Sequence, residues 1–186
     1  MNRIIKFVLI DILRNKIVIA YAVLLALLSW SVFNMEDSSS KGILTTLNMV
    51  LLVVPLVSVL FATIYIYNSA EFIELLLSQP VKRNQIWISL FFGLSLSLIC
   101  AYLLAVGIPL LLFAPLPQAL LLIVTGTLVT MIFVAIAFLS AILSRDKAKG
   151  IGISILLWLY FALLFDGLVL FLLFQFADYP IEKPMV

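Results

Sequence analysis

Apolar residues fall into five long runs along this chain, separated by short polar segments. The runs cover about residues 17–33, 43–67, 86–112, 118–143 and 151–176. Each approaches or exceeds the ~20 residues that a helix needs to cross a hydrocarbon core ~30 Å thick. Leucine dominates and hydrophobicity does not alternate with a period of two, which favours helices over barrel strands. The pattern predicts an all-α polytopic membrane helix bundle, one transmembrane domain over residues 1–186, with Pro55 bending the second span.

Basic residues alternate between the connecting segments. Nine of the eleven Lys and Arg residues lie in three of them: 1–16, 68–85 and 144–150. The segments between these, 34–42, 113–117 and 177–186, hold only Lys41 and Lys183. Because cytoplasmic loops carry the excess of Lys and Arg, the first set and the N-terminus should be cytoplasmic. Five spans then leave Val186 outside, so we expect the natural sequence to continue into a sixth span; a short outside tail is the alternative.

Composition excludes several classes of function. Apolar residues make up 66% of the chain and charged residues 11%, too few for the surface of a soluble domain. Histidine is absent and Cys100 is the single cysteine, so we expect no metal-ligand set and no disulfide. The phosphate-binding motif G-x-x-x-x-G-K-[ST] is also absent, which predicts that this chain does not itself hydrolyse ATP. The first apolar run is too long for a cleavable signal peptide.

The segment after the second run predicts a short amphipathic helix over about residues 68–80, lying across the direction of the spans. Asn68 is a suitable N-cap, with Glu71 three residues later, and Pro80 ends the helix. The polar stripe comprises Glu71, Glu74 and Ser78, and the apolar side comprises Phe72, Ile73, Leu76 and Leu77. Interfacial helices are usually basic on their polar face, so the acidic stripe favours docking of a soluble partner over adsorption to lipid.

Two further patterns concern helix packing. Residues 2–15 form a weaker amphipathic helix with Arg3, Lys6 and Arg14 on one sector, which favours an interfacial anchor near anionic lipid over a partner contact. Small residues recur every four positions in the third span: Ser89, Gly93, Ser97, Ala101 and Ala105. Such a ridge lets another helix approach closely. It predicts packing within the chain, with a subunit interface as the alternative.

Asp166 is the one acidic residue deep within an apolar run. An ionisable group at membrane depth is costly and is a functional hypothesis by default. No Lys or Arg lies at comparable depth to pair with it. A protonated Asp166 hydrogen-bonded inside the bundle and a proton or ion relay therefore both remain open.

Two segments resemble the permease subunits of ABC-2 type transporters. Residues 71–83, which end in LLLSQPVKR, are similar to the end of that family's coupling helix, and residues 144–152 (SRDKAKGIG) are similar to its cytoplasmic loop before the fifth span. The resemblance implies six spans, an interfacial helix over 1–16 and a coupling helix docked on a separate ATPase, which binds the ATP and Mg²⁺. No cofactor is implied for this chain. The implied docking residues are Glu71, Phe72, Ile73, Glu74, Leu75, Leu76, Leu77, Ser78, Gln79 and Pro80. The implied loop contacts are Lys82, Arg83, Arg145, Asp146 and Lys147.

Within that family, residues 69–87 and 165–186 are most similar to permeases that serve the maturation of nitrous oxide reductase. This similarity implies a homodimer in a bacterial cytoplasmic membrane, with two ABC ATPase subunits below and a periplasmic β-helical protein above. The complex would serve copper-centre assembly, with no nucleic acid involved. Since His is absent and Cys is scarce, we expect the bundle to transmit force and not to ligate copper.

Two other classes of function stay open. One is an ABC-2 exporter of a lipid, drug or glycan, which shares the same motifs. The other is a self-contained channel or secondary transporter that uses Asp166. An enzyme is the least expected class, because no nucleophile–base set is evident.

Overall fold

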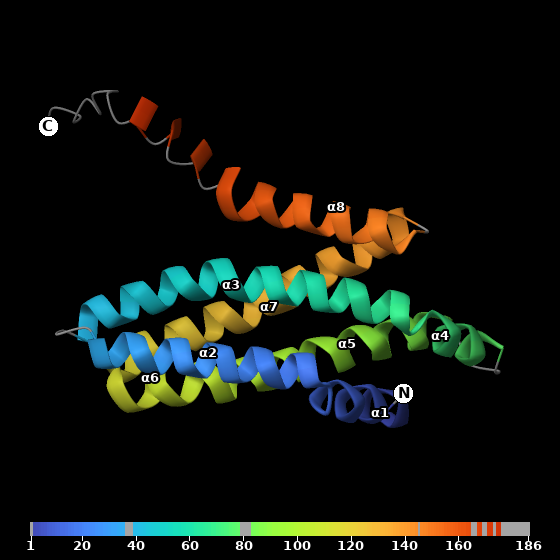
Figure 1. Cartoon of the computed structure of the whole chain (residues 1–186), viewed down its shortest axis with the longest axis horizontal. Coiled ribbons are helices and arrows are strands. Elements are labelled where there is room, and N and C mark those ends of the chain that lie inside the picture. The colour runs from blue at the N-terminus through green and yellow to red at the C-terminus, as the bar shows by residue number, and fades with distance from the viewer. Residues whose placement is uncertain are drawn as a thin grey trace, which may run out of the picture.

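The computed structural model is a bundle of long helices with short connections (Figure 1). It describes residues 2–35, 39–78, 83–144, 146–164, 167–168, 171–172 and 174–175. The elements are α1 (Asn2–Leu13), α2 (Lys16–Met35), α3 (Ser39–Asn68), α4 (Ala70–Leu77), α5 (Arg83–Tyr102), η1 (Leu103–Gly107), α6 (Ile108–Phe113), α7 (Leu116–Leu143), α8 (Lys147–Leu159) and η2 (Tyr160–Leu164). η1 and η2 are π-helical turns. The described residues contain no strand.

Five helices in these described ranges are long and apolar enough to cross a membrane: Lys16–Met35, Lys41–Asn68, Arg83–Phe113, Leu116–Leu143 and Lys147–Leu164. Each corresponds to one of the five apolar runs, and the third combines α5, η1 and α6. The prediction of an all-α polytopic helix bundle is therefore confirmed. Asp166 and residues 177–186 lie outside the described residues, as do Gln79, Pro80, Lys82 and Arg145.

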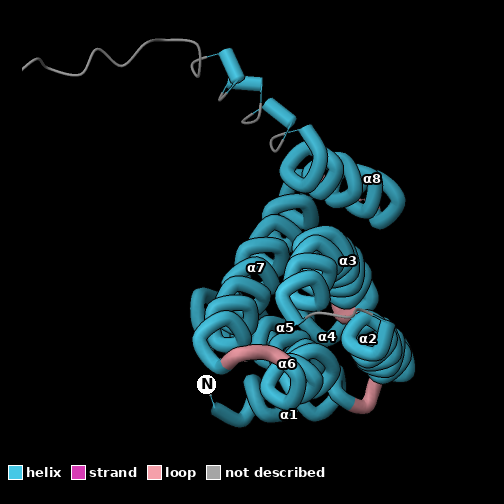
Figure 2. Tube along the Cα trace, turned by 90° about the vertical axis from the view of Figure 1, so that its left-hand side faces the viewer, coloured by secondary structure: helices cyan, strands magenta, loops and turns pink. Residues whose placement is uncertain are grey.

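The bundle has a centre and two flanks, which Figure 2 shows end-on. α3 and α5 both pack along α7, α1 packs along α5, and α2 contacts η1, α3 and α5. α8 lies at the edge of the bundle, and its main contacts are with α3, α7 and η2. Only 11% of the span formed by α8 and η2 is buried, against more than half of the α3 span. α8 is therefore the least enclosed of the five spans.

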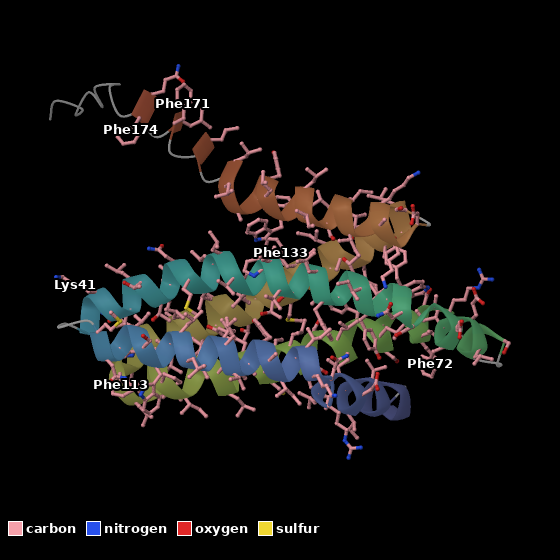
Figure 3. All side chains as sticks on the ribbon, viewed as in Figure 1. Lys41, Phe72, Phe113, Phe133, Phe171 and Phe174 are labelled. Atoms are coloured by element: carbon pink, nitrogen blue, oxygen red, sulfur yellow. The ribbon has the colours of Figure 1, made fainter. Side chains whose placement is uncertain are left out.

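The two ends of the bundle differ in charge. One end holds α4, the start of α5 and the α7–α8 junction, with the α1–α2 junction in the same half of the molecule (Figure 1). We call it the basic end because five described basic side chains are exposed there: Arg14, Lys16, Arg83, Lys147 and Lys149. Figure 3 shows Lys41 at the opposite end. An aromatic contact joins α2 and α6 at that opposite end, with the Phe113 ring 5.6 Å from both Trp30 and Phe33.

Proline explains two local features. Pro109 has no N–H to donate to the carbonyl of Ala105, and the wider π-helical turn η1 ends two residues before it. Pro55 lies inside α3 and likewise leaves the Leu51 carbonyl without its α-helical donor. The indole N–H of Trp158 donates to the next carbonyl, that of Leu52, at 3.3 Å. α8 thus contacts α3 close to the proline.

Tyr102 fixes the distance between α5 and α7. Its side chain is fully buried, and its hydroxyl donates to the Leu122 carbonyl at 3.0 Å. The ring lies so close to Gly126 that a Cβ there would overlap it, with the ring Cε1 2.7 Å away. Only glycine admits the tyrosine at this crossing.

We expect Gly126→Ala to destabilise the protein by about 1–3 kcal/mol, because Tyr102 must shift and its bond to Leu122 weakens. The free energy of unfolding in mixed micelles measures this. Gly107→Ala is the matched control, since the nearest atom to a Cβ there is 3.8 Å away. Equal stability of the two variants would contradict the role assigned to Tyr102.

Candidate partner-docking site at the basic end

α4 presents two different faces. Ile73 is 7% exposed and Phe72 is half-buried against the hydrophobic core, so these side chains attach α4 to the bundle. The other side is exposed and comprises Glu71, Glu74, Leu75 and Ser78. These four positions follow the i, i+3, i+4, i+7 spacing of one helix face. The side chains of Leu76 and Leu77 are outside the described set.

Among the described side chains of α4, the exposed face combines two acids with the large apolar Leu75. Leu75 is 66% exposed and is flanked on the same face by Glu71 and Glu74. The Ser78 hydroxyl donates to the Leu75 carbonyl at 2.8 Å, which closes the end of the helix. Such a face complements a surface with basic groups around an apolar depression.

Two details of the predicted helix were wrong. It begins at Ala70, and Asn68 is the last residue of α3 and not an N-cap, because α3 extends one residue beyond the expected end of the second span. The Asn68 side-chain oxygen instead accepts a hydrogen bond from Lys147 at 2.8 Å. α4 also does not lie across the spans: it continues outward from α3 beyond the ends of the other helices (Figure 1). Ser69, between the two helices, bonds through its amide to α3 and through its carbonyl to α4.

The end of α3 is fastened to the α7–α8 junction. The Tyr67 hydroxyl donates to the Ser144 carbonyl at 2.7 Å, next to the Lys147–Asn68 bond. A Cβ at Gly150 would overlap the Tyr67 ring, so this glycine receives the ring against the first turns of α8. We call Tyr67, Asn68, Ser144, Lys147 and Gly150 the α3–α8 clamp.

The predicted loop contacts have different roles. Asp146 is the N-cap of α8, where its carboxylate accepts from the Ala148 amide at 3.1 Å. The Asp146 amide in turn lies 3.3 Å from the Ser144 hydroxyl. Lys147 belongs to the α3–α8 clamp, whereas Arg83 is exposed at the start of α5. The junction is therefore ordered by bonds within itself as well as by α3.

The N-terminal helix is held by protein contacts. Val8 and Ile12 are fully buried, and α1 lies along α5, where the Ser97 hydroxyl is 3.4 Å from the Leu9 carbonyl. Asp11 accepts a hydrogen bond from the Tyr65 hydroxyl at 3.1 Å. The sequence predicts an interfacial anchor, and the structure adds that α1 is attached to both α3 and α5.

The small-residue ridge of the third span faces inward. All five members are buried inside the chain: Ser89, Gly93, Ser97, Ala101 and Ala105. α1 covers the ridge at Ser97, and Ala105 lies beside α2 in a cavity that Ala22 and Ala26 also line. The ridge thus packs within the chain.

Among the described residues no group of three or more Cys, Asp or Glu side chains could hold a metal ion.

Sequence reasoning missed Tyr67, Gly150 and Asp11. The available signal for Gly150 was a glycine inside a helical pattern, which often marks a close approach of another element. Nothing in the sequence connects Gly150 with Tyr67, because the two residues are far apart in the chain and lie on helices that are not consecutive.

We expect Gly150→Ala to destabilise the protein by about 1–3 kcal/mol, because the added methyl displaces the Tyr67 ring from its position against α8. Gly152→Ala, two residues along the same helix, meets no atom within 4 Å. It should stabilise α8 by up to about 1 kcal/mol through helix propensity. Unfolding in mixed micelles compares the two, and the same sign for both would contradict the packing described.

The scan of protein-family models gave no match to this chain, and the search of curated proteins gave none either.

Proposed function

We propose that the chain is a membrane permease subunit of an ABC-type complex, in which a partner subunit hydrolyses ATP. The basic end would face the cytoplasm of a bacterium and the N-terminus would lie there too, in accord with the positive-inside rule. The resemblance of residues 71–83 and 144–152 to ABC-2 permeases supports this reading. In this proposal the chain is not an enzyme, and it binds neither ATP nor Mg²⁺.

The observation that carries the proposal is the two-faced α4. Ile73 anchors the helix to the bundle, while Glu71, Glu74 and Leu75 remain exposed beyond the ends of the spans. A helix that only rested on lipid would bury its apolar side in the bilayer and carry basic residues on the other. α4 instead leaves an acidic face open at the basic end, where a soluble ATPase would bind.

The division of α4 assigns roles to the expected docking residues. Glu71, Glu74, Leu75 and Ser78 would contact the ATPase, whereas Phe72 and Ile73 would position the helix. The ATPase surface would supply basic groups for the two carboxylates and an apolar depression for Leu75. Salt would weaken this contact, because exposed charges are screened within ~8 Å at physiological ionic strength.

We propose further that the permease acts in copper-centre maturation of nitrous oxide reductase, as NosY does. Its similarity to such permeases over residues 69–87 and 165–186 supports this. The partners would be a NosF-like ATPase, a NosD-like periplasmic β-helical protein and a second copy of this chain. In this proposal the bundle transmits motion to the periplasmic face without ligating copper itself.

Co-purification with the ABC ATPase subunit tests the docking face. We expect the wild-type chain to retain the ATPase, and Leu75→Asp or the double variant Glu71→Gln/Glu74→Gln to lose most of it. The matched control is Asn84→Lys/Gln85→Lys, which alters the net charge equally at exposed positions of α5 at the same end. Retention of the ATPase by the α4 variants would refute docking at this face.

Copper content of nitrous oxide reductase tests the finer proposal. A strain lacking this protein should produce the enzyme with its copper centres depleted, and expression of the wild-type chain should restore them. Metal analysis of the purified enzyme measures the effect. Normal copper content together with a defect in export of a lipid, drug or glycan would favour the ABC-2 exporter instead.

A further inference from the structure

We propose that Tyr67 and Lys147 are positioning residues that make α8 follow any displacement of α4. This inference rests on the proposed function only for the source of the displacement, which would be the docked ATPase. The mechanical connection itself is a property of this chain alone and can be measured without a partner.

The first step is that α4 is continuous with the end of α3. The Ser69 amide donates to the Tyr65 carbonyl at 2.9 Å, and the Ile73 amide donates to the Ser69 carbonyl at 2.9 Å. Backbone hydrogen bonds thus run through the bend between the two helices. With Ile73 buried as well, α4 and the last turn of α3 form one stiff unit.

The second step concerns how α4 meets the bundle. Its main contacts in the described part of the chain are with α3 and α5. A shallow cavity of about 310 Å³ is lined by Ile73 and Glu74 of α4 on one side and by Ala141 and Ile142 of α7 on the other. A push on α4 therefore reaches the rest of the bundle mainly through the end of α3 and the start of α5.

The third step is the α3–α8 clamp. Tyr67 and Asn68 belong to the stiff unit, and they bind Ser144 and Lys147 with bonds of 2.7 and 2.8 Å. Gly150 admits the Tyr67 ring against α8, so the ring also opposes sliding between the two helices. The Asp146 N-cap ties the junction to the first turn of α8. The connection from α4 to α8 is complete.

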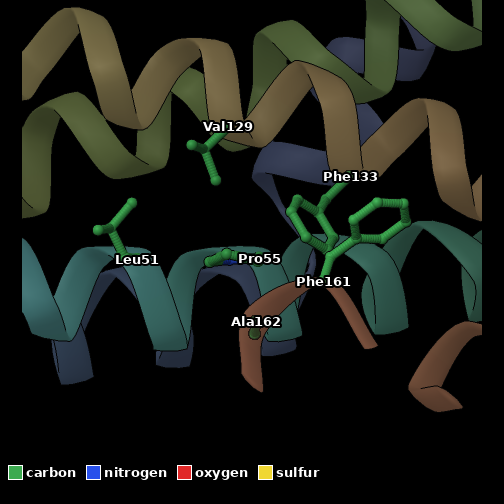
Figure 4. A pocket seen from close by; sticks show the side chains of 6 residues that line it. All are labelled: Leu51, Pro55, Val129, Phe133, Phe161 and Ala162. Atoms are coloured by element: carbon green, nitrogen blue, oxygen red, sulfur yellow. The ribbon is translucent and has the colours of Figure 1, made fainter. Parts of the chain in front are cut away.

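The fourth step is that α8 has room to respond. Beyond the clamp, the described side-chain bond from α8 to α3 is that of Trp158 to the Leu52 carbonyl. Just past it, a cavity of about 170 Å³ is lined by Phe161 and Ala162 of η2, by Leu51 and Pro55 of α3 and by Phe133 of α7 (Figure 4). Because empty volume lies next to Pro55 and the π-helical turn η2, the end of α8 and η2 can tilt at a low cost in free energy.

Electron paramagnetic resonance distance measurement between two spin labels tests the connection from α4 to α8. Labels on Ser78→Cys in α4 and Ala148→Cys in α8, both exposed positions, are placed in a Cys100→Ala background in nanodiscs. We expect a narrow distance distribution for the otherwise wild-type chain. The variant Tyr67→Phe/Lys147→Ala should show a broadened or shifted distribution, because the two clamp bonds are lost.

The control carries the same two kinds of substitution at exposed sites of the same helix region, Tyr160→Phe/Lys149→Ala, and should match the wild type. A broad distribution in the wild type, or a clamp variant indistinguishable from the control, would overturn the inference. Gly150→Ala adds a second variant that leaves both bonding side chains in place.

A second measurement uses the complex with the ATPase. The clamp variant should still co-purify with the ATPase, but the ATP-dependent displacement of the label on α8 should be lost. If the ATPase fails to bind the wild-type chain while the clamp variant still broadens the α4–α8 distance, the proposed function fails and the clamp stands. An undiminished displacement of α8 in the clamp variant overturns the clamp.

Discussion

Helices inside a bilayer gain little from hydrophobic burial against each other, because lipid tails are as apolar as their side chains. Association then depends on close packing and on hydrogen bonds between helices. In this chain two tyrosines meet both needs in the same way. Tyr102 and Tyr67 each lie against a glycine, Gly126 or Gly150, and each donates its hydroxyl to a backbone carbonyl a few residues before that glycine. The first contact joins α5 to α7, and the second joins α3 to the α7–α8 junction.

These two contacts explain why the bundle is tight in one part and loose in another. α5 and α7 are held at a distance that the Tyr102 contact sets, α3 packs along α7, and α1 covers the small-residue ridge of α5 at Ser97. α8 is joined to α3 at the basic end through Tyr67 and Lys147 and further along through the Trp158–Leu52 bond, and it runs along the edge of the bundle. A hydrogen bond between membrane helices contributes only ~0.6–2 kcal/mol, so the steric fit at the glycines matters as much as the bonds.

The elements of this fold were predictable from the sequence, but their pairing was not. Leucine-rich runs give the spans because length and hydropathy decide membrane insertion locally. The ridge from Ser89 to Ala105 predicts a close approach without naming the helix that makes it. Asn68 looks like an N-cap by residue type, yet it is the last residue of α3, and its side chain accepts from Lys147 of a distant segment. For α4 the sequence pattern placed the acidic residues and Ile73 on opposite faces, as the structure has them. The exposure of Leu75 on the acidic face is evident only from the packing.

A connection that transmits motion must be stiff at one place and compliant at another. The chain has the stiff part at the basic end, where α4, the last turn of α3 and the start of α8 share backbone and side-chain bonds. It has the compliant part deeper in the bundle, where Pro55 and η2 border the same small cavity. If the cavity were filled, α8 would be fixed along its length and could only move together with α3 and α7. If Tyr67 were released, α4 could swing without moving α8. Coupling between the two ends therefore requires both the bond and the void.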